Sequence, residues 1–498
     1  MRTGFNLIAI ILLSMIVFSA CDEETVVPLV DETNNGFQKK EVAEIFAQNC
    51  LDAGCHGNSD PHHNLKLTSY SEMMKGSIGR PLGNHSHKLV AKINHGVDVY
   101  GGSPVVPFNA ERSLLYQLIT GSIEDQNQRM PYQRNLLSQT QIDVIKNWID
   151  EGARDYNGNV PYSSGQKIFV CNQGSDEIFE IDAQNNVVSR ILNVDLLPSV
   201  TDAPHNIQIR GGYYYVTLIA AGRLLKIDAS TNQIIDQVSG LENAGMLQIT
   251  NDGKTAFVSR SSTAPSIYNV IYAIDTETMT KKADISLPVT GLPHAIWLSS
   301  DDTKLFVGNL TKDRISIVDV ATLEVLEDDI VLSSGTEPTH EPMHLYVSPD
   351  DKYLYVNCRK SSLMLIINLE TKQVLQELII KEHPMQSAIS QDGNKIYTVS
   401  NHEPIITEIT KSGESWSITR EFTSEAFHHL YGADLSPDGK YLYVTCSNND
   451  PNDQFERHYK IAGEFRPSLV CVYDVTTGEL VKILDVGSFA TGIASREN

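Results

Sequence analysis

Two cysteines and a histidine lie within seven positions in the stretch AQNCLDAGCHGNSD, residues 47–60. Cys50, Cys55 and His56 read C-x4-C-H, which is two residues longer than the C-x-x-C-H that attaches a haem covalently. In such a site two thiols add to the haem vinyl groups and the adjacent imidazole turns onto the iron. A haem site, a disulfide, a zinc site and a chance cluster all remain open for these three residues.

The alternatives to haem each lack something. A disulfide does not need a histidine directly after its second cysteine. A structural zinc site needs four ligands, usually as two paired sets, and the sequence has no second cysteine pair. Nitrogen ligands for a metal could come from the histidines that follow the motif, which are His62, His63, His85, His87 and His95.

Haem iron in such a site also needs a sixth ligand, and methionine commonly supplies it. Met130 lies in the polar stretch NQRMPYQRN, followed directly by Pro131. A single methionine is more often a core residue than a ligand. The charged and polar residues before Met130 make it an unusual packing residue, so we take it as the candidate distal ligand.

Three helices are expected to position these residues. FQKKEVAEIFAQNC, residues 37–50, has apolar residues near the helical period and runs into Cys50. ERSLLYQLITG, residues 111–121, repeats the pattern and stops at Gly121. SQTQIDVIKNWIDEGA, residues 138–153, opens with Ser138 as a candidate N-cap and ends at Gly152. The region from about 36 to 155 is therefore predicted to be helical.

This layout resembles the small c-type cytochrome domains of planctomycetes and their relatives. The matching segments are CHG at 55–57, NLKLTSYSEMMKG at 64–76, MP at 130–131 and WIDEGA at 148–153. The resemblance covers residues 37–156 and implies an all-α cytochrome c-like domain with one covalent haem c.

On that resemblance Cys50 and Cys55 carry the thioethers, His56 is the proximal iron ligand and Met130 the distal one. The extra residues between the cysteines require a small bulge. Gly54 can supply it because glycine tolerates unusual backbone angles.

From residue 165 onward the rhythm changes to short strands that repeat. The core element begins at residues 168, 214, 256, 305, 354, 396 and 442, so the copies lie 42 to 49 residues apart. Turn sequences such as NDGK, SPDDK and SPDGK precede most copies and are typical of hairpins. Seven copies of this length predict an all-β seven-bladed propeller over residues 165–498. The domain begins with the second strand of a blade and ends with an innermost strand, so its two ends should complete one blade.

The strands LYVN and LYVT, at 354 and 442, resemble those of the YVTN family of propellers. That resemblance implies the fold, whereas propellers have many unrelated activities. In the innermost strands His205 and His294 share one register, and His344 lies one place later. Imidazoles gathered on the axis could bind a transition metal or support catalysis, although packing or turn geometry is the simpler explanation for them.

The first twenty residues are typical of a targeting segment. Arg2 precedes an apolar run at 6–18, and FSAC places small residues before Cys21. This resembles a bacterial lipoprotein signal, residues 1–20, in which Cys21 becomes the lipidated first residue. Residues 21–36 would then be a linker, and the protein would be held in the cell envelope by its lipid alone.

The net charge of −23 argues against nucleic acid as a partner. The charge suits a basic redox partner steered by electrostatic attraction. Cys171, Cys358, Cys446 and Cys471 lie in predicted strands and are interpreted as small buried residues.

The sequence therefore predicts a haem c lipoprotein that transfers electrons, with the propeller as scaffold or docking domain. One alternative is an oxidoreductase whose active site or metal lies at the propeller centre and feeds electrons to the haem. A further alternative is a surface binding protein with a vestigial haem site.

Overall fold

The computed structural model describes residues 34–59, 61–76, 103–197, 200–261, 269–335, 338–424, 426, 428–447 and 467–495. The predicted signal segment 1–20, the lipidation candidate Cys21 and most of the linker 21–36 lie outside these residues. No helix within the described segments is long and apolar enough to cross a membrane.

Helices occupy the N-terminal part of the described chain, as expected. They are α1 (Lys40–Asn49), α2 (Tyr70–Met74), α3 (Leu114–Thr120) and α4 (Gln139–Asp150), with short 3-10 turns η2 (His62–Asn64) and η3 (Gln126–Gln128). The predicted start of α4 is confirmed, because the Ser138 hydroxyl caps the Gln141 N–H and the Gln141 side chain accepts from the Ser138 N–H. The predicted stop of α3 is also confirmed, with Gly121 in the left-handed conformation at φ 77°.

One hydrophobic cluster holds the helical region together. The ring of Phe37 packs 5.5 Å from both Phe46 of α1 and Trp148 of α4, measured between centroids. Trp148 is fully buried, and its indole N–H donates to the carbonyl of Arg154 at 3.0 Å. A bridge between Phe37 and Asp155 joins the two ends of the region. The chain thus closes on itself before the propeller begins.

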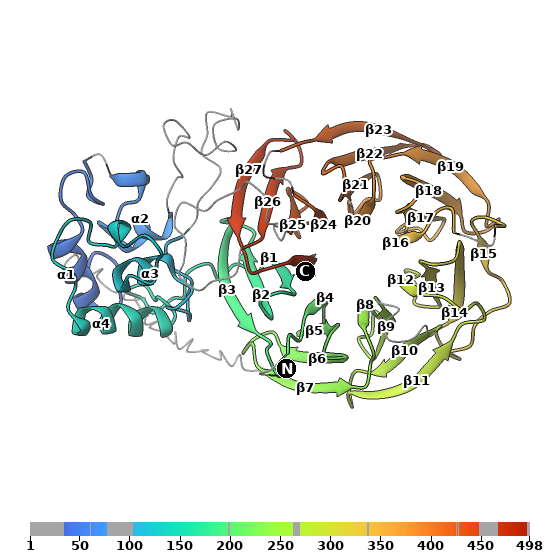
Figure 1. The fold of residues 1–498 in the computed structure, drawn as a ribbon, viewed down its shortest axis with the longest axis horizontal. Coiled ribbons are helices and arrows are strands. Elements are labelled where there is room, and N and C mark those ends of the chain that lie inside the picture. Colours follow the sequence, from blue (N-terminus) through green and yellow to red (C-terminus); the bar gives the residue numbers. More distant parts are fainter. Residues whose placement is uncertain are drawn as a thin grey trace, which may run out of the picture.

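The described residues after 165 form seven four-stranded antiparallel sheets arranged around a centre (Figure 1). The first blade has β1 (Lys167–Asn172), β2 (Glu177–Asp182) and β3 (Val187–Asn193), and the second has β4 (Pro204–Arg210), β5 (Tyr213–Leu218), β6 (Arg223–Asp228) and β7 (Ile234–Ser239). The third has β8 (Ala244–Ile249), β9 (Thr255–Arg260), β10 (Val270–Asp275) and β11 (Thr280–Ser286), and the fourth has β12 (Pro293–Leu298), β13 (Lys304–Asn309), β14 (Arg314–Asp319) and β15 (Ile330–Val331).

The remaining blades follow the same order. The fifth has β16 (Pro342–Val347), β17 (Tyr353–Cys358), β18 (Leu363–Asn368) and β19 (Val374–Ile379), and the sixth has β20 (Pro384–Ile389), β21 (Lys395–Ser400), β22 (Ile406–Ser412) and β23 (Ser415–Phe422). The seventh has β24 (Leu430–Leu435), β25 (Tyr441–Cys446), β26 (Leu469–Asp474) and β27 (Leu480–Asp485), and β28 (Ala490–Ser495) comes last. The seven-bladed propeller predicted from the repeat is confirmed.

The predicted closure of the ring is confirmed as well. β28, the last strand, pairs antiparallel with β1, the first, with Phe169 opposite Ala494 and Val170 opposite Ile493. The first blade therefore has the strand order β28-β1-β2-β3. Because each end of the repeat region supplies part of this sheet, hydrogen bonds between the two chain ends fasten the ring.

The recurring polar residues of the repeat serve the turns. Before the second strand of a blade, the Ser348 hydroxyl donates to the Asp350 carboxylate and accepts from the Tyr353 N–H. After the third strand, the Asp228 carboxylate accepts from the N–H groups of Ser230 and Thr231 at 2.9 Å each. These bonds satisfy backbone groups that the tight turns leave unpaired. The repeated acids are therefore structural.

Cys171, Cys358, Cys446 and Cys471 are all fully buried, which confirms their interpretation as small strand residues.

The helical region contacts the closing blade, beside which it lies in Figure 1. The Arg112 guanidinium pairs with the Glu177 carboxylate of β2 at 2.6 Å. In the other direction, the Arg190 guanidinium of β3 lies over the Phe108 ring, 4.0 Å from its centroid. Cation–π and partly buried ion pairs of this kind attach the helices to the outer part of one blade.

Candidate functional site

The motif CLDAGCH forms a compact loop at the end of α1. The Cys50 N–H donates to the Phe46 carbonyl at 2.8 Å, so the helix fixes the first cysteine. The Cys55 N–H donates to the Asp52 carbonyl at 2.9 Å, and the His56 N–H reaches back to the Cys50 carbonyl at 3.0 Å. These bonds bring both thiols and the imidazole onto a single turn of the chain.

Two glycines allow the loop to take this shape. Gly54 has φ 77°, the left-handed conformation that the sequence predicts for the extra residues between the cysteines. At Gly57 a side chain is excluded by space, because a Cβ there would lie 2.3 Å from the Leu51 carbonyl oxygen. The glycine of the CHG segment is thus required by the fold of the loop.

The imidazole of His56 is held by the backbone. Its Nδ1 lies 3.1 Å from the Leu65 carbonyl oxygen, which can only accept, so Nδ1 carries the proton and donates. Nε2 is left with its lone pair, the arrangement found in metal-binding histidines whose other nitrogen is fixed by a backbone carbonyl. Burial lowers the pKa of His56, and the positive charge on His62 would lower it further. The ring is therefore neutral at pH 7 and chemically able to bind a metal.

The two thiols lie at the edge of the helical core. Cys50 is partly buried against the hydrophobic cluster. Burial, followed by the neighbouring Cys55, raises the pKa of the Cys50 thiol to about 12. Both cysteines are free, so the structure joins neither in a disulfide. A pair of free thiols beside an imidazole is compatible with covalent attachment of a ligand.

Met130 lies on a second loop that meets the same cluster. Its N–H donates to the Leu118 carbonyl of α3 at 3.0 Å, and its side chain packs with Cys50 against the shared core. An ion pair between Arg134 and Asp52 joins this loop to the cysteine loop. The pair is exposed, so it contributes little to stability. The structure thus brings the methionine loop and the cysteine loop together at one end of the helical region.

The predicted shared register of His205 and His294 is confirmed, since each is the second residue of an innermost strand around the central channel of the propeller. The same position holds Gly245, Met343, Met385 and Tyr431 in β8, β16, β20 and β24. His205 uses both ring nitrogens, with Nδ1 2.6 Å from the Gln173 amide nitrogen and Nε2 3.1 Å from the Ser261 hydroxyl. Its imidazole is thereby fixed by side chains of the propeller itself.

The other two histidines of the channel are buried in packing contacts. His294 is 5% exposed, and its Nδ1 donates to the Met343 carbonyl at 3.1 Å. His344 packs its ring against Tyr346, with 4.6 Å between centroids. Burial lowers the pKa of both imidazoles to about 3. These environments favour the packing interpretation over a shared metal.

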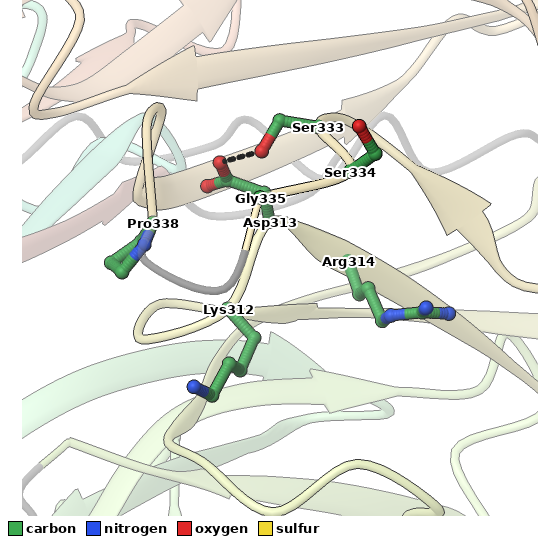
Figure 2. A pocket seen from close by; sticks show the side chains of 7 residues that line it. All are labelled: Lys312, Asp313, Arg314, Ser333, Ser334, Gly335 and Pro338. Atoms are coloured by element: carbon green, nitrogen blue, oxygen red, sulfur yellow. Dashed lines mark hydrogen bonds between the residues drawn. The ribbon is translucent and has the colours of Figure 1, made fainter.

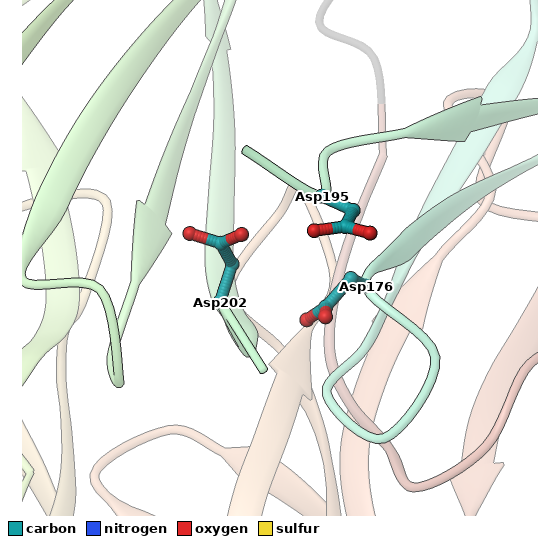
Figure 3. Close-up of side chains that lie close together, drawn as sticks. All are labelled: Asp176, Asp195 and Asp202. Carbon is teal, nitrogen blue, oxygen red and sulfur yellow. The ribbon is translucent and has the colours of Figure 1, made fainter. Parts of the chain in front are cut away.

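Among the described residues, one group of three or more His, Cys, Asp or Glu has ligand atoms within 4.8 Å of one another. It consists of Asp176, Asp195 and Asp202 (Figure 3). The channel histidines do not form such a group. No motif in the sequence joins these three aspartates, because Asp176 lies in the β1–β2 turn whereas Asp195 and Asp202 lie on the connection from β3 to β4.

A small polar pocket lies elsewhere, at the fourth blade (Figure 2), lined by Lys312, Asp313, Arg314, Ser333, Ser334, Gly335 and Pro338. The Asp313 carboxylate accepts from the Ser333 hydroxyl at 2.6 Å and from the N–H groups of Thr339 and His340. Its acceptors are already used to hold the loop that leads into β16. The pocket is therefore a structural feature of that loop.

The sequence identified Cys50, Cys55, His56 and Met130 as candidate ligands, and it missed Leu65. The role of Leu65 belongs to its backbone carbonyl. A carbonyl has no side-chain signature, so only the fold of residues 56–67 reveals it.

No protein-family model and no curated protein matches this chain. Among solved structures, a functionally unknown protein from Desulfotomaculum acetoxidans has a TM-score of 0.53 at 13% identity, covering 67% of this chain and 99% of that one. Hydrazine synthase from Kuenenia stuttgartiensis has a TM-score of 0.47 at 18% identity, covering 56% of this chain and 89% of that one. The β-propeller domain of Cps50 (Swd1) from Myceliophteria thermophila has a TM-score of 0.45 at 13% identity, covering 57% of this chain and 87% of that one. At 13% identity the first likeness shows a shared fold alone, and the other two, with TM-scores below 0.5, support no inference about this chain.

Proposed function

We propose that this protein is an exported lipoprotein that carries one haem c and transfers single electrons, with the propeller as its scaffold or docking domain. The observation that supports the proposal best is the orientation of the His56 imidazole beside the two thiols. The imidazole follows two free thiols on one turn, and its Nδ1–H is held by the Leu65 carbonyl at 3.1 Å. That bond leaves Nε2 available as a ligand.

The residues of the loop suit a covalently attached haem. Cys50 and Cys55 would hold it by thioether bonds, and His56 and Met130 would hold the iron. A haem c there supplies reversible one-electron chemistry at its iron. The chain itself orients the imidazole through Leu65, fixes the first thiol at the end of α1, and presents Met130 from a loop on the same core.

The surroundings of the loop support an electron carrier. Cys50 and Met130 are partly buried against apolar side chains, which limits contact of a bound group with water. Burial and a thioether ligand both favour the reduced iron and so raise its potential. The chain's net charge of −23 would attract a basic redox partner and raise its association rate.

The resemblances of residues 37–156 to planctomycete c-type cytochrome domains and of residues 165–498 to YVTN propellers are consistent with this function. Lipidation at Cys21 would keep the protein in the bacterial cell envelope, where c-type haem is attached. A nucleic-acid partner is not part of the proposal, because nucleic acids bind to positively charged proteins and this chain has a net charge of −23.

An oxidoreductase with its active site in the propeller channel has less support. His205, which is half-buried whereas His294 and His344 are buried, has both nitrogens in hydrogen bonds to Gln173 and Ser261. A reactive or metal-binding imidazole would need one of them free. No contact in the described channel specifically favours this alternative. A surface binding protein with a vestigial haem site would leave the thiols unused.

The visible spectrum of protein made with haem-attachment machinery tests the proposal. Reduced wild type should show the sharp bands of a low-spin c-type haem. Met130→Ala should keep the haem but leave the iron high-spin or water-ligated, with a lower potential, because the thioether favours the reduced iron. His56→Ala should lose the proximal ligand and accumulate no haem.

Met343→Ala is the matched control, because it removes a partly buried methionine of the propeller channel. It should leave the spectrum and the potential unchanged. A low-spin spectrum and potential that persist in Met130→Ala would contradict the ligand assignment.

A further inference from the structure

Three aspartates meet where the closing blade passes into the second blade. Asp176 lies in the turn between β1 and β2, Asp195 follows β3, and Asp202 precedes β4. One carboxylate oxygen from each lies within 4.8 Å of the others. Figure 3 shows the three carboxylates around one space between these connections.

Asp202 supplies a second observation that does not depend on clustering. Its side chain is 0% exposed. Oδ2 accepts from the N–H groups of Leu196 and Leu197, at 2.7 and 3.0 Å, whereas Oδ1 is buried without a hydrogen-bond partner. Burying a carboxylate oxygen away from water without a hydrogen-bond partner costs free energy. A bound ligand at this oxygen would offset that cost.

The negative charge of the cluster is also uncompensated. No lysine, arginine or histidine among the described residues forms an ion pair with Asp176, Asp195 or Asp202. Asp176 accepts from the Ala203 N–H at 2.7 Å, and its carboxylate lies close to those of the other two aspartates, whose negative charges repel it. A cation at the cluster would relieve both the repulsion and the unsatisfied oxygen.

We propose that Asp176, Asp195 and Asp202 bind a calcium ion. Ligands made only of carboxylate oxygens suit hard cations rather than zinc, copper or iron. Calcium takes oxygens at about 2.3–2.6 Å, so two ligands on opposite sides of one ion lie about 4.8 Å apart. The spacing of the three oxygens fits within that limit. Asp195 is exposed, so solvent can reach the ion and supply the remaining ligands.

Calcium is preferred over magnesium on geometric grounds. Magnesium needs oxygens at about 2.0–2.1 Å in a near-ideal octahedron. Asp202 and Asp176 each use one oxygen to accept from backbone N–H groups. These bonds fix the two carboxylates and limit their movement into the octahedral positions that magnesium needs. Calcium tolerates the irregular arrangement that these backbone bonds impose.

Such an ion would join two blades. It would tie the β1–β2 turn and the end of β3 to the chain that enters β4. These are elements of the closing blade and of the next blade in the ring. Binding to the folded state alone raises the unfolding temperature in proportion to the logarithm of the ligand concentration. The site would therefore stabilise the propeller beside its closure, independently of haem.

The test is calorimetric titration of CaCl2 into the full chain after treatment with a chelator, together with unfolding temperatures at rising calcium concentrations. We expect one ion per chain and an unfolding temperature that rises with calcium. In Asp202→Asn the amide oxygen can keep both backbone bonds while its nitrogen replaces Oδ1, so the loop should fold and calcium binding should be lost. Asp195→Asn alters the exposed ligand and should weaken binding at least tenfold.

Asp236→Asn is the matched control, because Asp236 is an exposed aspartate on β7 of the second blade. It should bind calcium as wild type does. Wild type that takes up no calcium and unfolds at a calcium-independent temperature would overturn the proposal. Unchanged binding in Asp195→Asn, or a preference for MgCl2 over CaCl2, would also overturn it.

Discussion

The imidazoles of this protein fall into two kinds of environment. His56 is half-buried on a loop, has one nitrogen held by a backbone carbonyl and follows two free thiols. His205 and His294 lie in the inner strands of the propeller, where hydrogen bonds and neighbouring blades enclose their rings. The first environment leaves a nitrogen for a ligand, and the second uses the ring to connect blades. The same residue type thus keeps a nitrogen available for a ligand in one region and is used for packing in the other.

The buried channel histidines should make the propeller sensitive to acid. Burial lowers the pKa of His294 to about 3, against 6.5 for a free histidine. As pH falls through 6.5 the unfolded chain takes up a proton that the folded chain refuses, so the free energy of unfolding falls. Between pH 7 and pH 5 this one residue should remove about 2 kcal/mol of stability.

His294→Asn can keep a donor for the Met343 carbonyl but cannot take up that proton. Between pH 7 and pH 5, its free energy of unfolding should therefore fall by about 2 kcal/mol less than that of wild type. Denaturant unfolding at the two pH values measures the difference. Equal pH dependence in the two proteins would show that His294 is not held neutral by the fold.

At the scale of elements, the loop from Cys50 to Gly57 is the part on which the proposed site depends most. Gly57 lies next to His56, and a Cβ there would come 2.3 Å from the Leu51 carbonyl oxygen. Gly57→Ala should therefore force the loop apart and cost about 1–3 kcal/mol of stability in the helical region. The helical circular dichroism signal on heating measures the loss.

Gly165→Ala is the control, since a Cβ at Gly165 would meet nothing within 4 Å. It should change stability by no more than about 0.5 kcal/mol. If the two alanine variants unfold alike, the close packing of Gly57 against Leu51 is wrong.

Most elements could be predicted because their signals are local. The helical period and the cap at Ser138 located α4, and the repeat length with its hairpin turns located the blades. The partner of His56 could not be predicted, because a backbone carbonyl carries no sequence signal. The three aspartates were not predicted for another reason. Asp176 lies in a different turn from Asp195 and Asp202, and only the fold brings that turn beside the connection from β3 to β4.

At the scale of the whole molecule, the two parts of the chain meet at the blade that closes the ring. β28 and β1 close that blade, and Arg112 and Arg190 attach the helical region to its outer strands. The helical region that contains the cysteine loop is therefore attached to one blade. A partner that docks on the propeller would meet this loop beside that blade. The ring order and its closure followed from the repeat, whereas these side-chain contacts between the regions did not.

The central claim is that the chain carries one haem bound through Cys50 and Cys55, and the intact mass of acid-denatured protein tests it most directly. Protein should be matured in a host with haem-attachment machinery, then unfolded in acid, which removes a haem held only by iron ligands. For wild type we predict a mass greater than that of the chain by one haem. In Cys50→Ala the haem should remain attached through a single thioether to Cys55. A mass equal to the chain alone, with Cys50 and Cys55 joined in a disulfide, would contradict the account.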